Sequence, residues 1–219
     1  MDRVAAQAEI HSVFSTYKAT TPTDRRLVRA LKTGKLYELY VLSRVVEALR
    51  LRGCRLRFSG SVLKFKGGPG MLKTSDAHFE VVLPSLRLCW LFVDIEFDTL
   101  GHHRTGGVSD NSRRHELDIV LVTHNSGYPT HEDILLAVEC KSTAKFGKGI
   151  VKEILGVRRE LGYVTSHQRS ILTRNGCHPR VDVPSAPPSE HWLVFVDPKG
   201  SDYAESPAAF GITFQHWEP

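Results

Sequence analysis

The sequence lacks the cysteine patterns of disulfide-bonded and zinc-ribbon proteins. Four cysteines stand far apart in the chain and form no CxxC pair: Cys54, Cys89, Cys140 and Cys177. Such spacing indicates neither a disulfide framework nor a structural zinc site. We therefore expect a reducing, cytoplasmic environment.

Long hydrophobic runs are also missing. No apolar stretch reaches the roughly 18 to 20 residues that a membrane-spanning helix requires, and Met1 is followed by a mixed polar stretch rather than a signal peptide. We expect a soluble protein without a membrane partner.

Neither sign of charge dominates, and no repeat or low-complexity block is present. The 219 residues include 29 lysines and arginines against 24 acids, a net charge of +5, which suits a polyanionic partner only weakly. The glycine cluster at 67–70 lacks a phosphate-loop signature and indicates a turn. The length fits one domain with additions.

Hydrophobic periodicity predicts an α/β protein whose mixed central sheet is flanked by helices. An N-terminal helical accessory (1–33) would precede the main domain (34–219), with Thr21 or Thr23 capping its second helix. The expected helices cover 2–18, 24–32, 35–52 and 146–163. The expected strands cover 78–83, 87–97, 116–122, 133–141, 191–196 and 210–216, with a hairpin at 56–65 and a proline-rich connection at 175–190.

The run from Ile134 to Lys141 is an apolar strand that ends in Glu139, Cys140 and Lys141. Charged side chains at the end of such an apolar strand cost free energy unless a partner or ligand binds them. Residues two apart on a strand share a face, so Glu139 and Lys141 project together and Cys140 points to the opposite side. This pattern makes the end of the strand a candidate site.

Asp118 is the one acid within the preceding apolar run from Leu117 to Val122. If the two strands pair as a hairpin in which the numbers of opposed residues sum to 257, Asp118 lies opposite Glu139. Two adjacent carboxylates repel unless a cation separates them or one takes a proton. Oxygen ligands favour Mg²⁺, with Mn²⁺ as a substitute, over zinc.

A third acid, Glu38, lies on the apolar stripe of the helix at 35–52, one turn before Leu42. Together with Asp118 and the Glu139-Cys140-Lys141 run, it resembles the PD-(D/E)xK nuclease superfamily, the restriction-endonuclease-like fold, over residues 35–197 with its αβββαβ order of elements.

The resemblance implies a role for each of these residues. Asp118 and Glu139 would be the main metal ligands, joined by the backbone carbonyl of Cys140, with Glu38 at a second metal or a metal-bound water. Lys141 would act on the attacking water.

The resemblance implies Mg²⁺-dependent hydrolysis of phosphodiester bonds, by a DNA endonuclease with a role in restriction or antiviral defence. Leu117 stands where the written motif has proline, and the glutamine-and-tyrosine motif of some exonuclease branches is missing. One site cuts one strand, so double-strand cleavage requires a homodimer or successive nicks. A regulatory partner protein would restrain such a nuclease. The alternatives are a non-catalytic nucleic-acid-binding or assembly module and a ribonuclease.

Basic residues near these acids are candidates for nucleic-acid binding, or else ordinary solvated surface. They are Lys145, Lys148, Lys152, Arg158 and Arg159 on the helix after the site, and Arg113 and Arg114 just before Asp118.

Two other groups offer competing metal sites. Asp94, Glu96 and Asp98 alternate along one strand, an arrangement more typical of a solvated face than of metal binding. The loop histidines lack zinc-ligand spacing and are expected at the surface: His102, His103, His115, His124 and His131.

Overall fold

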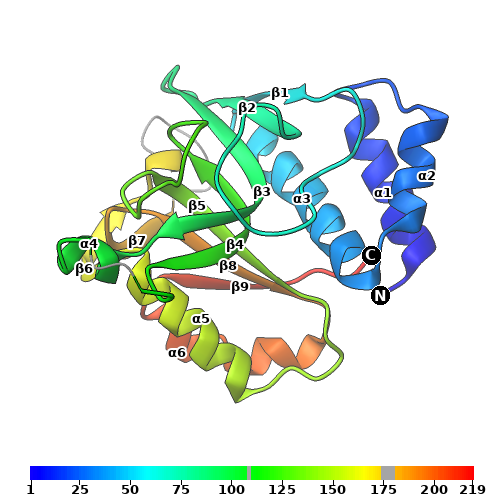
Figure 1. Ribbon diagram of the computed structural model, residues 1–219. Helices are drawn as coiled ribbons and strands as arrows, with labels where there is room; N and C mark the ends of the chain where they lie inside the picture. The colour runs from blue at the N-terminus through cyan, green and yellow to red at the C-terminus, as the bar shows by residue number, and fades with distance from the viewer. Residues whose placement is uncertain (108–109, 174–180) are drawn as a thin grey trace.

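A mixed β-sheet forms the centre of the molecule, seen here in a computed structural model that describes residues 1–107, 110–173 and 181–219 (Figure 1). Within these residues the sheet has seven strands in the order β1-β2-β3-β4-β5-β8-β9, and β6 and β7 form a separate pair. Cys177 and part of the expected 175–190 connection lie outside the described residues.

The strands are β1 Arg55–Ser59, β2 His78–Val82, β3 Leu88–Asp98, β4 Arg114–Val122, β5 Ile134–Lys141, β6 Tyr163–Arg169, β7 Asp182–Ala186, β8 Glu190–Phe195 and β9 Ile212–His216. The helices are α1 Arg3–Ser15, α2 Pro22–Ala30, α3 Thr33–Leu51, α4 Leu100–Arg104, α5 Lys148–Glu160 and α6 Glu205–Ala208. Short 3₁₀ turns cover Ile171–Thr173 and Pro198–Tyr203.

Helices cover both faces of the sheet. Figure 1 shows α1, α2 and α3 on one side and α5 and α6 on the other. Apolar residues of α1 and α3, including Phe14 and Leu42, share one core with β-strand residues such as Val138. On the α5 side, Ile154 packs with Phe195. None of the described helices combines the length and apolar character needed to cross a membrane.

The mixed sheet confirms the expected α/β class. The strands β1 to β5 are antiparallel neighbours, whereas β8 and β9 join parallel to β5. The hairpin register is confirmed as well, because Ile119 pairs with Val138 and Leu121 with Leu136, both sums being 257.

Several expected elements differ from the structure. The hairpin at 56–65 was wrong, because β1 pairs with β2 and the intervening chain forms a loop. The pair β6 and β7 was not expected, and β7 lies within the predicted 175–190 connection. The helix expected at 146–163 is confined to Lys148–Glu160, because Gly147 is its N-cap and β6 begins at Tyr163.

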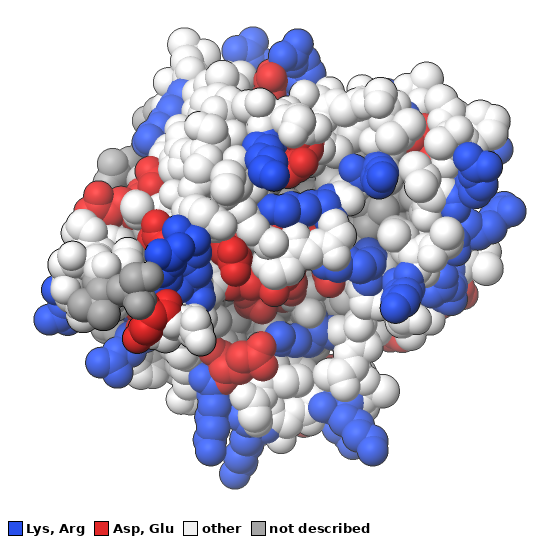
Figure 2. Space-filling view, viewed as in Figure 1, with Lys and Arg blue, Asp and Glu red and all other residues white. Residues whose placement is uncertain are grey.

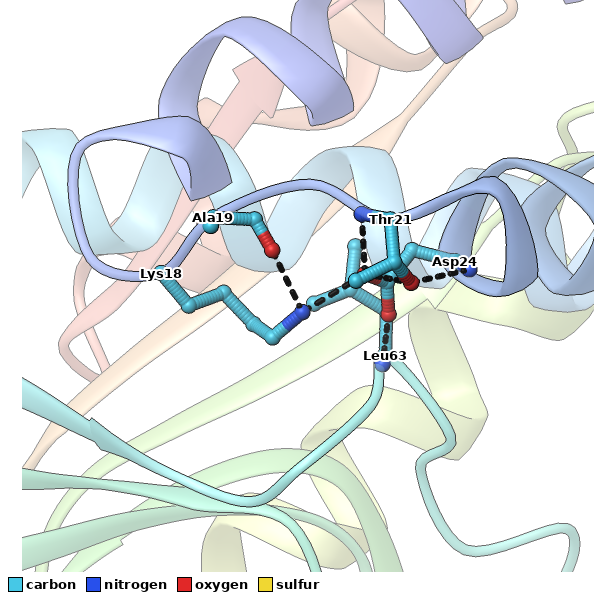
Figure 3. Close-up of polar contacts among 5 residues, drawn as sticks. All are labelled: Lys18, Ala19, Thr21, Asp24 and Leu63. Atoms are coloured by element: carbon cyan, nitrogen blue, oxygen red, sulfur yellow. Dashed lines mark hydrogen bonds and ion pairs between the residues drawn. The ribbon is translucent and has the colours of Figure 1, made fainter.

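A buried carboxylate fastens the N-terminal helices to the loop after β1 (Figure 3). Asp24 is inaccessible to solvent. Its Oδ2 accepts hydrogen bonds from Lys18 Nζ at 2.6 Å and from the backbone N–H and hydroxyl of Thr21, both at 2.8 Å. Its Oδ1 accepts from the backbone N–H of Leu63 at 2.7 Å. The cap of α2 is therefore Thr21, not Thr23.

Asp24→Asn should lower the free energy of unfolding by about 3 kcal/mol at pH 7, because it leaves the partly buried Lys18 without its anion. Burial alone would raise the pKa of Asp24, but hydrogen bonds from Lys18, Thr21 and Leu63 outweigh it and hold the pKa below its usual value. The stabilisation is thus present above the ordinary aspartate pKa of about 4 and is lost as the pH falls below it.

Urea unfolding of both proteins from pH 3 to pH 8 measures this difference. The gap between wild type and Asp24→Asn should narrow below about pH 4. The exposed Asp202→Asn provides the matched control, and a gap independent of pH would contradict the assignment.

Candidate active site at a strand fork

Two neighbouring strands part at Asp118 and Glu139, at a point we call the strand fork. The ladder between β4 and β5 begins at Ile119 and Val138. Before that point, β4 pairs with β3 alone, from Arg114 onwards, whereas β5 continues along β8. The strands thus separate at the two residues that the hairpin register sets opposite each other.

The side chain of Asp118 bridges the fork. Its Oδ2 accepts a hydrogen bond from the backbone N–H of Cys140 at 2.6 Å. A side-chain oxygen therefore meets a backbone donor where the ladder has ended, and this contact fixes the carboxylate between the strands. Cys140 itself packs against the core on the α3 side.

Asp94 on β3 is brought to the same place by an irregular backbone. Its φ of 52° is left-handed, which is rare for a non-glycine residue and costs on the order of 1 kcal/mol inside a strand. The ladder of β3 and β4 pairs Val93 with Ile119 and Ile95 with Leu117 and passes over Asp94 and Asp118. Both aspartates therefore sit at one distortion of the sheet.

The expectation of a solvated acidic face on β3 was wrong for Asp94. It is inaccessible to solvent, and its neighbours Val93 and Ile95 are buried in different core clusters. Glu96 is half-buried, and Asp98 instead forms an ion pair with Arg114 at 2.8 Å. Strict alternation fails because the left-handed residue shifts the phase of the strand.

Glu38, Asp94 and Asp118 form a cluster that we call the acidic group. One carboxylate oxygen from each lies within 4.8 Å of the others, although they come from α3, β3 and β4. Lys35, one turn before Glu38 on α3, donates to Glu38 Oε2 at 2.7 Å and also pairs with Asp94. The lysine is an internal counter-ion for two of the three acids.

A second set of charges lies on the α5 side of Asp118. Glu139 is almost fully buried and lies 3.7 Å from Lys141, measured from Oε2 to Nζ. Lys141 Nζ donates to Glu153 Oε1 on α5 at 2.7 Å. The lysine is therefore positioned chiefly by α5, and Glu139 is not a member of the acidic group.

Crowding and burial disfavour the ionised carboxylates. Burial raises the pKa of Glu38 to about 7. The negative charges of Asp118 and Asp94 also raise this pKa, whereas the contact with Lys35 lowers it. Burial likewise raises the pKa of Asp118, and burial together with the Asp118 charge raises that of Glu139 well above the ordinary value. Burial would lower the pKa of Lys141, but the contacts with Glu153 and Glu139 outweigh it and raise it.

The donor set fits a hard divalent cation. Carboxylate oxygens are the ligands that Mg²⁺ and Mn²⁺ prefer. Three of them converge in the acidic group. Lys35 pairs with Glu38 and Asp94, and Lys141 pairs with Glu139 and Glu153. The residues that would hold the ion are those of the acidic group, with Glu139 beside Asp118 as a further oxygen donor.

The basic residues expected to bind nucleic acid are mostly accessible. Figure 2 shows acidic side chains gathered in the middle of one face with lysine and arginine side chains around them. The residues exposed on and just before α5 are Lys145, Lys148, Lys152 and Arg159. Arg113 and Arg114 are half-buried, and Arg114 also lies over the ring of Tyr128.

Two expected surface residues are buried instead. Arg158 was considered part of the solvated basic face, but its guanidinium donates to the carbonyls of Phe210 and Ser189 at 2.8 and 3.2 Å. It faces the core because it follows Ile154 by one helical turn. His131 is also buried, with its ring 5.3 Å from that of His103.

No protein-family model, curated protein or solved structure matches the chain. The functional argument therefore depends on the residues of the chain and their geometry.

Glu38→Gln should stabilise the metal-free protein at pH 8 by on the order of 2 kcal/mol. Because burial raises the folded-state pKa of Glu38 to about 7, the folded state holds a proton that the unfolded state has released, and wild-type stability should fall as the pH rises from about 4.5 to about 7. The variant should lack this fall. Urea unfolding measures both effects.

Glu47→Gln, on the same helix and paired with Arg50 near the surface, is the matched control and should not stabilise the protein. A Glu38→Gln protein less stable than wild type at pH 8 would show that Glu38 is a structural ion-pair partner of Lys35.

Proposed function

We propose that this protein is a metal-dependent nuclease with a restriction-endonuclease-like core, and that it hydrolyses phosphodiester bonds in DNA. The observation that supports it best is the convergence of Glu38, Asp94 and Asp118 from three separate elements, with Glu139 and Lys141 across the fork. The order of α3, the antiparallel strands up to β5, α5 and the parallel β8 agrees with that core.

The acidic group and Glu139 would hold Mg²⁺. When bound, a divalent ion supplies charge neutralisation at the phosphate and a water of lowered pKa. Asp118 has the central place, because its Oδ2 is fixed by the Cys140 N–H while its carboxyl group belongs to the cluster that includes Glu38 and Asp94.

Lys141 would orient the attacking water and balance negative charge on the reacting phosphate. Its raised pKa keeps it an ammonium at neutral pH, so it donates hydrogen bonds and does not serve as a base. Glu153 positions this ammonium from α5. A group fixed in this way stabilises charge in the transition state without first reorganising.

One observation favours a second, non-catalytic function. Lys35 already pairs with Glu38 and Asp94, as a permanent substitute for a metal would. A nucleic-acid-binding module that keeps the fold without turnover would need no ion there. The two functions differ in whether Mg²⁺ binds and whether DNA is cut.

Wild type should nick supercoiled plasmid in Mg²⁺ or Mn²⁺, and chelation of the metal should stop it. Asp118→Asn and Lys141→Ala should each lower the rate at least about a hundredfold, because each removes a group that acts on the transition state. Gel analysis of nicked and linear DNA measures the rate, and a parallel RNA substrate tests the ribonuclease alternative.

The matched controls are Asp2→Asn, which keeps an efficient cap on α1, and the exposed Lys199→Ala. Both should cut at the wild-type rate. Cleavage that persists in Asp118→Asn and Lys141→Ala would refute the site, and metal-independent binding without cleavage would support the non-catalytic function.

The exposed lysines of α5 should contribute to DNA affinity through phosphate contacts. For a Lys148→Ala/Lys152→Ala double variant, the slope of log K against log salt should become shallower by about 2, because each phosphate contact releases about one counterion. Fluorescence anisotropy with a labelled duplex measures it. A Lys73→Ala/Lys199→Ala variant, which changes two other exposed lysines, should retain the wild-type slope, and an equal loss in both variants would contradict the assignment.

A further inference from the structure

A pocket of about 120 Å³ borders the acidic group. It lies between α2, α3, β3 and the loop after β1, and two of its lining residues, Glu38 and Asp94, are members of the acidic group. A molecule in this pocket would therefore lie next to the acidic group and could contact Glu38, whose side chain is partly exposed.

The walls of the pocket are mainly apolar. They are formed by Leu27, Leu31, Leu39, Leu63, Phe65 and Val93. An apolar cavity of about 150 Å³ accommodates a benzene molecule. The pocket is smaller than such a cavity, so one flat ring would enter it only in part.

The pocket also carries positive charge. Lys35, Lys64 and Lys66 line it, and Lys64 and Lys66 flank Phe65 in the sequence. An aromatic ring between two ammonium groups is the combination that single-stranded nucleic acid uses, since bases stack on the ring and the phosphates pair with the cations.

The loop that carries Phe65 is held in place. Asp24 accepts a hydrogen bond from the Leu63 N–H, as Figure 3 shows. The ring of Phe65 makes edge-to-face contacts with Phe14 and Phe58, at centroid distances of 5.9 and 6.0 Å. A wall fixed in this way binds a ring without first paying the entropy of ordering the loop.

We infer that this pocket receives one unstacked base of the nucleic acid, next to the phosphate at the acidic group. The inference rests on the proposed nuclease function and narrows its substrate class: the preferred substrate has an unpaired base beside the scissile bond. Lys64 and Lys66 favour a nucleotide over an apolar protein side chain, because the nucleotide brings phosphates to them, whereas Lys35 already pairs with Glu38 and Asp94.

Binding to two labelled DNA duplexes tests this inference without turnover, with Ca²⁺ in place of Mg²⁺. One duplex carries a central unpaired 2-aminopurine, and the other is fully paired. Wild type should bind the first about tenfold more tightly by anisotropy, and the emission of 2-aminopurine should change on binding.

Phe65→Ala should abolish the preference by removing the stacking surface. Leu27→Trp should abolish it by filling the pocket from α2, and this variant keeps Phe65 and its contacts. Phe210→Ala, which removes an exposed phenylalanine outside the pocket, is the matched control and should retain the preference. Thermal unfolding confirms that each variant is folded.

Loss of the preference in Phe65→Ala and Leu27→Trp, but not in Phe210→Ala, would support the inference. Equal affinity of wild type for both duplexes, or a preference that survives Leu27→Trp, would overturn it. If wild type shows no preference for the unpaired base but still nicks plasmid in Mg²⁺, the nuclease function stands without the base pocket. If wild type neither binds these duplexes nor cuts plasmid, both the nuclease function and the base pocket are refuted.

Discussion

Repulsion among carboxyl groups within a hydrophobic sheet is the constraint on which the rest of the site depends. Glu38, Asp94 and Asp118 lie close together where solvent is scarce, so a proton, a lysine or a metal must offset their charge. Lys35 partly does so from α3 for Glu38 and Asp94, and the charge of Lys141 does so for Asp118 across the fork. The left-handed Asp94 and the parting of β4 from β5 interrupt the regular sheet at the place where these carboxyl groups gather.

The sequence predicted much of the frame of this site. Alternation of apolar residues located β2 to β5, and the hairpin register was correct because one slip would move every apolar side chain of β4 to the wrong face. Glu38 was singled out because an acid on an apolar helical stripe is unusual, and the structure places it beside Asp94 and Asp118. These inferences worked wherever a regular period holds over a whole element.

Asp94 was assigned to a solvated face of its strand, and the reason for this error is physical. Periodicity assumes one backbone conformation along a strand, but the φ of 52° at Asp94 changes the face that its neighbours occupy. Neither the period nor the composition indicates such a reversal. Lys35 was missed for a similar reason, because a lysine in the first turn of a helix gives no sign of its distant partner. The pairing of β1 with β2 depends on a long loop, whose closure the local sequence does not specify.

The C-terminal segment has an optical consequence. Tyr37, the neighbour of Glu38 on α3, donates a hydrogen bond to the carbonyl of Trp217 at 2.9 Å. The indole of Trp217 in turn meets that of Trp192 at a centroid distance of 6.2 Å. Two of the three tryptophans are thus mechanically linked to the helix that carries Glu38. The intrinsic tryptophan fluorescence of the unmodified protein therefore reports how α3 responds when the charge around Glu38 changes.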